Sequence, residues 1–171
     1  MHTNLIDGTF DFQLTKPIQY AFGGQARTGT FVTFFEPQGS HVGPALRLKN
    51  IYMAAFPKLM ALADQMGGAK AAIADSALKK PHEATEADVS SDLGEMLLMI
   101  DSFDIDGFIA AFDKLVTTTH KHVAAKINNE QVFTASILDE ISPEDHLNMA
   151  AAYVNFMQER SQARKSGTGS G

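Results

Sequence analysis

The chain has 171 residues, which favours one domain with a core large enough to fold without disulfides or a structural metal. It has no cysteine, which excludes disulfides, thiolate metal sites and cysteine nucleophiles, and its net charge of −6 without a long basic run argues against nucleic acid as a partner. No secretory signal pattern and no apolar run near the ~20 residues of a membrane span are present, so we expect a soluble intracellular protein without a membrane partner.

The N-terminal region predicts a β-hairpin. Residues 10–22 alternate, and every even position except Lys16 is apolar, a period of two that indicates a strand with one buried face. Pro17 cannot donate a hydrogen bond to a neighbouring strand, so this strand should lie at an edge or carry a bulge there. Gly23 and Gly24 favour a reversal of the chain. Residues 28–35 then form a second β-prone run, which is apolar on both sides and should be the more buried strand.

Residues after Pro37 change to a helical period. Apolar residues at three- and four-residue steps predict an amphipathic helix from residue 43 or 44 to 65, with a kink or break near Pro57. Residues 69–79 predict a short alanine-rich helix, and residues 80–89 predict a polar, mobile connector.

Two further helices are expected before residue 120. Ser90 or Ser91 can cap the first of them. Its apolar stripe would consist of Leu93, Met96, Leu97, Ile100 and Phe103. Asp104 or Asp106 caps the next, whose helical repeat continues without a fault to Val116. Residues 131–138 fit either a strand or a helix.

The last helix begins with Ser142 as the cap and Pro143 at the first helical position. Its apolar residues cover more than half of its circumference, which is too wide for a surface helix. The helix should therefore lie deep in the core or meet something on a second side. Residues 161–171 predict a flexible polar tail.

Together these elements predict an α+β fold in a single domain, residues 1–160. An N-terminal antiparallel β-hairpin would pack on a mainly helical body of four to five helices. The hairpin has apolar surface that its two strands do not bury. A later strand near residues 131–134, a second copy of the chain or a binding partner could each pair with the hairpin or pack on it.

A search for chemistry finds one weak metal motif. Residues 102–113 align with a calcium-binding loop with Asp104 and Asp106 as ligands, but Ser102 and Asp113 replace the first aspartate and the final glutamate. Helix capping explains the same aspartates without a metal. His120 and His122 are two residues apart and cannot chelate one ion from a regular helix. We therefore expect no catalytic residue, no metal and no cofactor.

The expected active surface is an apolar one that binds protein. The candidates are the surplus apolar residues of the last helix and of the hairpin. The alternative explanation for each of them is that it packs in the core. The predicted contact residues are Met149, Tyr153, Phe156, Met157, Phe31 and Phe35.

Both ends of the chain resemble a known family. Residues 14–24 (LTKPIQYAFGG), residues 30–37 (TFVTFFEP), a helix that opens with LRLK at residue 46, and residues 141–147 (ISPEDHL) before a helix with Phe156 are similar to tail assembly chaperones of long-tailed bacteriophages. Residues 66–135 share with that family only a helical character with polar linkers.

The resemblance implies a chaperone that binds the tape-measure protein and prevents its aggregation before the tail tube polymerises. It also implies a non-enzymatic protein of the host cell cytoplasm that is absent from the mature virion. Further implied partners are a second copy of the chain or a frameshift-extended form. The alternatives are a structural minor tail or tail-completion protein, a small hydrolase or metal-dependent enzyme, and a homo-oligomeric regulator.

Overall fold

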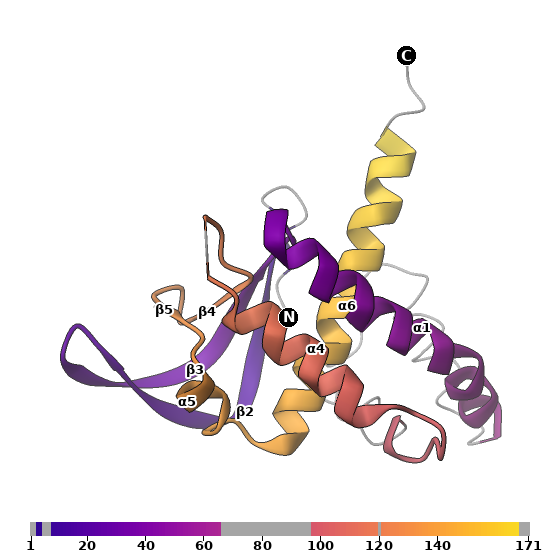
Figure 1. Ribbon diagram of the computed structural model, residues 1–171, viewed down its shortest axis with the longest axis horizontal. Helices are drawn as coiled ribbons and strands as arrows, with labels where there is room; N and C mark the ends of the chain where they lie inside the picture. The colour runs from indigo at the N-terminus through magenta and orange to yellow at the C-terminus, as the bar shows by residue number, and fades with distance from the viewer. Residues whose placement is uncertain (1–2, 5–7, 66–96, 120, 168–171) are drawn as a thin grey trace.

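The computed structural model describes residues 3–4, 8–65, 97–119 and 121–167, which form an α+β fold (Figure 1). A five-stranded antiparallel sheet has the strand order β1-β2-β3-β4-β5. The strands are β1 (Thr3–Asn4), β2 (Thr9–Phe22), β3 (Gln25–Phe35), β4 (Ala125–Ile127) and β5 (Gln131–Val132). The helices are a 3-10 turn η1 (Gly39–His41), α1 (Val42–Gln65), α4 (Ile105–Thr117), α5 (Ala135–Leu138) and α6 (Pro143–Gly167).

The predicted hairpin consists of β2 and β3. Gly23 and Gly24 form its turn with φ angles of 60° and 77°, a left-handed conformation that glycine adopts without strain. The even-numbered apolar residues of β2 face the core, as the alternation predicts. They are Phe10, Phe12, Leu14, Ile18 and Tyr20. Phe22 has the same parity but is exposed, because the hairpin extends beyond the helices to the left in Figure 1.

The irregularity expected at Pro17 is present. The register shifts between Gln13, opposite Phe31, and Ile18, opposite Gly29, so β2 has a bulge there. Gly29 is the residue that lets β4 approach, since a Cβ at this position would lie 2.6 Å from Cγ2 of Ile127.

The prediction that β3 is the more buried strand holds only for part of it. Val32, Thr33 and Phe34, which pair with β4, are buried, whereas the residues near the turn are exposed. The strand that pairs with β3 on the side away from β2 is β4 (Ala125–Ile127), which the sequence did not predict. Residues 131–138, left open between strand and helix, contain both: β5 pairs with β4, and α5 follows.

Two helix boundaries follow the predicted capping chemistry, and two other helix predictions differ from the structure. Asp104 caps α4, and its Oδ1 accepts a hydrogen bond of 2.9 Å from the N–H of Gly107. Ser142 caps α6, where its Oγ accepts from the N–H of Asp145 at 3.2 Å. The break considered near Pro57 is absent, because α1 runs from Val42 to Gln65 as one helix with the proline inside it. α6 continues to Gly167, and the tail predicted from residue 161 is helical over its first seven residues.

The last helix lies in the core, the first of the two placements that its wide apolar surface allowed. Phe10 and Phe34 stack at a centroid distance of 4.8 Å, and α6 adds Phe156 at 4.8 Å from Phe10 and Tyr153 at 5.5 Å from Phe34. On α4, the ring of Phe112 lies 6.0 Å from that of Phe34. Sheet, α4 and α6 therefore share one aromatic cluster.

Some predictions fall outside the described residues. These are the helix at residues 69–79, the connector at residues 80–89, the caps Ser90 and Ser91, and Leu93 and Met96 of the next stripe. Of that stripe, Leu97 and Ile100 are buried and Phe103 is partly buried against the core, but the predicted helix does not reach Phe103, because residues 99–104 form turns and irregular backbone.

Candidate functional site

The structure places three of the six predicted contact residues inside the protein. Met149 and Tyr153 are 0% exposed and Phe156 is 3% exposed. The hydroxyl of Tyr153 donates a hydrogen bond of 3.0 Å to the carbonyl oxygen of Phe35, which ties α6 to the end of β3. Core packing, the alternative explanation for these residues, accounts for their positions, and they present no surface to a partner in this structure.

The other three predicted residues are half-buried. Met157 packs at the edge of the core, and Phe31 and Phe35 lie on the face of β3 opposite to Val32 and Phe34. Among the described residues, α6 has no exposed large apolar side chain that could join these three in one surface. A binding role for Met157, Phe31 and Phe35 stays a prediction.

Three of the exposed large apolar side chains among the described residues lie on α1, while Leu98 and Met99 are exposed in the segment before α4. Val42 is 41% exposed, Leu46 is 54% exposed and Met53 is 41% exposed. At about 100° per residue these positions, with Lys49, fall within an arc of about 60° on the helix. We call the exposed residues Val42, Leu46 and Met53 the α1 stripe.

The α1 stripe is separate from the face that α1 buries. Leu48, Tyr52 and Leu59 pack into the core on a neighbouring side of the helix. α6 borders the stripe, since Nε2 of Gln158 donates a hydrogen bond of 3.0 Å to the sulfur of Met53. Next to Gln158, burial raises the pKa of the Glu159 carboxyl. The sequence signal for this stripe is a helix with more apolar positions than one buried face needs, and the same signal is stronger in the last helix.

The α1 segment itself carries positive charge. Residues 42–62 contain Arg47, Lys49 and Lys58 and no acidic residue, although the whole chain carries −6. Lys58 donates a hydrogen bond to the hydroxyl of Ser102, whereas Arg47 is exposed on the surface. α1 therefore combines exposed apolar side chains with cations.

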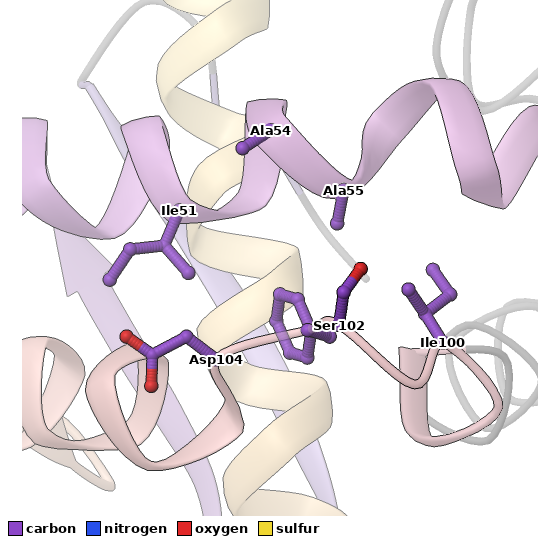
Figure 2. A pocket seen from close by; sticks show the side chains of 7 residues that line it. Ile51, Ala54, Ala55, Ile100, Ser102 and Asp104 are labelled. Carbon is purple, nitrogen blue, oxygen red and sulfur yellow. The ribbon is translucent and has the colours of Figure 1, made fainter.

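A small pocket lies between α1 and the segment before α4 (Figure 2). Ile51, Ala54 and Ala55 line it from α1, and Ile100, Ser102, Phe103 and Asp104 line it from the other side. Its volume of about 180 Å³ is below the ~300 Å³ at which small-molecule sites begin. Asp104 is already engaged as the α4 cap, so this pocket offers little for ligand recognition.

Two aspartates of the weak calcium motif have other roles. Asp104 caps α4, while Asp113 accepts a 2.6 Å hydrogen bond from Nε2 of His146, a pair that the sequence did not reveal. His122 is exposed, and His120 lies outside the described residues. In the residues that the structure covers, no group of three or more histidine, aspartate or glutamate side chains is placed to hold a metal ion.

No helix among the described residues is long and apolar enough to cross a membrane. Comparisons of the chain with protein-family models, with curated proteins and with solved structures found no match.

Proposed function

We propose that this protein is a tail assembly chaperone of a long-tailed bacteriophage. In this proposal it binds the tape-measure protein in the host cell cytoplasm, prevents its aggregation until the tail tube forms, performs no catalysis and is absent from the mature virion. The segments that resemble that family support the proposal, and they correspond to β2, β3 and the beginnings of α1 and α6.

The observation that carries the proposal is the α1 stripe. A tape-measure protein is expected to be a long, helix-rich chain, and an amphipathic helix binds best to an accessible apolar surface of complementary width. Val42, Leu46 and Met53 offer such a surface on a folded body, and the methionine side chain adapts to irregular partners. In this proposal the client binds at α1, because three of the four α6 residues first expected to bind, Met149, Tyr153 and Phe156, are buried.

Co-expression with the tape-measure protein of the same genome tests the proposal. We expect the client to stay soluble and to co-elute with this protein in size-exclusion chromatography. If the client remains insoluble and no complex elutes, the proposal fails. Abundance of this protein in purified virions would instead favour the structural alternative, a minor tail or tail-completion protein.

A matched pair of variants locates the binding surface. The double substitution Leu46→Ser with Met53→Ser removes the apolar stripe, and we expect it to abolish co-elution while the protein remains folded. The control carries Asn50→Ser and Ala54→Ser, which lie exposed on the same helix but outside the stripe. Equal binding by both double variants would contradict a client site on α1.

A further inference from the structure

The outer edge of β2 has partners at two places before residue 18 and none at residues 18–22 in the part of the chain that the structure describes. Near the body, β1 pairs with Thr9 and Phe10, and Pro17 has no N–H to offer. At the bulge, the buried carboxylate of Asp145 accepts the N–H groups of Thr15 and Lys16 at 3.1 and 3.5 Å. Beyond it, residues 18–22 pair only with β3 within the described part of the chain.

The corresponding edge of β3 is covered by β4 at Val32–Phe34 and by the side chain of Asn128 at Thr28–Phe31. The side-chain oxygen of Asn128 accepts the N–H of Thr30 at 3.1 Å, and its amide nitrogen donates to the carbonyl of Thr28 at 2.8 Å. The side chain thereby extends the pairing of β4 towards the hairpin turn. Of the two strands in the hairpin, β2 therefore has the longer free edge.

The free segment lacks the usual protection of an exposed sheet edge. Native edges carry charges, proline or bulges that prevent pairing with another chain. Residues 18–22, Ile-Gln-Tyr-Ala-Phe, contain no charged residue and no proline. Gln19 and Ala21 are exposed, and Phe22 is 38% exposed at the tip.

We propose that the outer edge of residues 18–22 binds the same segment of a second copy of this chain, as an antiparallel strand pair with a two-fold axis at Tyr20. In this register Gln19 lies opposite Ala21 of the partner copy, and Ile18 lies opposite Phe22, which covers the exposed ring. A sheet edge accepts an extended strand through backbone hydrogen bonds, and a helix cannot supply them.

Three observations favour a second copy as the occupant. The segment is uncharged, so identical strands meet without repulsion. An antiparallel pair about Tyr20 is self-complementary, and it closes as a dimer instead of continuing into a fibre. The hairpin extends away from the helices, which leaves room for the partner's hairpin beside it (Figure 1).

The length of the pairing sets its strength. Lys16 and Pro17 at the bulge end the free edge on one side, and the Gly23–Gly24 turn ends it on the other. Five residues per chain form a smaller contact than the roughly 1,200 Å² of a standard stable interface. The dimer should therefore form reversibly and depend on protein concentration.

Sedimentation equilibrium of the purified protein over a range of concentrations tests the proposal. We expect the average mass to rise from that of the 18.5 kDa chain towards twice that value. A mass that stays monomeric at every concentration overturns the proposal. The dimer proposal depends on the sheet edge alone. A protein that fails to bind the tape-measure protein can still dimerise, and a monomeric protein can still be a chaperone.

Charge variants test the register. Gln19→Lys with Ala21→Lys places like charges opposite each other across the two-fold axis, and we expect the dimer to be lost. Gln19→Lys with Ala21→Glu places opposite charges there, so the dimer should persist or strengthen. The matched control, Ala26→Lys with Thr28→Lys, puts the same charge on exposed positions of β3 and should dimerise as the native protein does. If substitutions at residues 19 and 21 do not change dimerisation, or if only those at residues 26 and 28 do, the assignment of the interface to the edge of β2 is overturned.

Discussion

Asp145, fully buried in the first turn of α6, binds Thr15 in the bulge of β2, 130 residues away in the sequence. Its carboxylate accepts the backbone N–H of Thr15 at 3.1 Å and the hydroxyl of Thr15 at 2.9 Å. The bulge interrupts the pairing of β2 with β3, so its N–H groups need another acceptor. The carboxylate of Asp145 thus accepts the N–H groups that the bulge leaves unpaired, and it holds the start of α6 against β2.

Substitution of Asp145 by alanine should destabilise the protein by about 3 kcal/mol. The change leaves the N–H groups of Thr15 and Lys16 without the buried carboxylate that they bind, and hydrogen bonds to a charged group are worth more than neutral ones. Urea unfolding followed by circular dichroism measures the loss. Glu144→Ala is the matched control, because Glu144 is exposed in the same helical turn and should change stability by less than about 0.5 kcal/mol. Equal effects of the two substitutions would show that the bulge does not depend on Asp145.

Asn128 has a similar role on the other edge of the hairpin. Besides its bonds to Thr28 and Thr30, it has a φ of 47°, and Asn129 beside it has a φ of 62°. Glycine tolerates this backbone conformation, so Asn128→Gly removes the side-chain bonds without adding strain. We expect it to lower the unfolding free energy by about 1–2 kcal/mol.

The control for this prediction is Asn129→Gly. Asn129 is exposed and also has a positive φ, so the substitution should leave stability unchanged or raise it slightly. Thermal unfolding of the two variants under the same conditions compares them. If Asn128→Gly is as stable as Asn129→Gly, the side chain of Asn128 does not hold the edge of β3.

The parts of the fold that follow from local chemistry were predictable from the sequence. The alternation in β2, the Gly23–Gly24 turn and the caps Asp104 and Ser142 each depend on residues within a few positions of one another. β4 was missed because three residues carry little periodic signal, and its pairing with β3 joins segments about 90 residues apart.

The candidate site was harder to predict for a related reason. A wide apolar surface on a helix indicates that two sides are apolar, but it does not say which neighbour covers each side. On α6 the sheet and α4 cover most of that surface and bury Met149 and Tyr153. On α1 the corresponding surplus, with Leu46 at its centre, remains exposed. Only the packing of distant elements distinguishes the two cases.

Substitutions on these two helices should therefore have opposite consequences. Phe156→Ala removes a ring that packs on Phe10 at a centroid distance of 4.8 Å, and it should cost about 3–5 kcal/mol through the cavity it leaves. Leu46→Ala, at a residue 54% exposed, should change stability by less than about 0.5 kcal/mol. Denaturant unfolding of both variants measures the difference. A stable Phe156→Ala protein would return Phe156 to the set of surface candidates.

The three tyrosines of the chain make stability depend on pH in alkaline solution. Burial raises the pKa of Tyr52 to about 12, and burial also raises the pKa values of Tyr153 and Tyr20, with the carboxylates Glu36 and Glu130 adding to the respective shifts. In the unfolded chain a tyrosine ionises near pH 10, roughly its ordinary pKa. Because the folded pKa values are higher, the contribution to stability is complete below pH 10 and is lost as the pH rises towards 12 and above.

The expected result is an unfolding free energy that falls steeply between pH 10 and 12, with Tyr52 alone accounting for about 3 kcal/mol at the upper end. Urea unfolding at a series of pH values measures the fall, and the ultraviolet absorbance of tyrosinate shows when the rings ionise. Tyr52→Phe is the matched variant, since phenylalanine keeps the packing against Phe108 but cannot ionise in the unfolded chain. Its unfolding free energy should fall less steeply over the same interval. Two outcomes would contradict this prediction: identical slopes for the native protein and Tyr52→Phe, or tyrosinate absorbance that appears near pH 10 while the protein is still folded. Either would mean that Tyr52 is accessible to water and that its ring does not belong to the core.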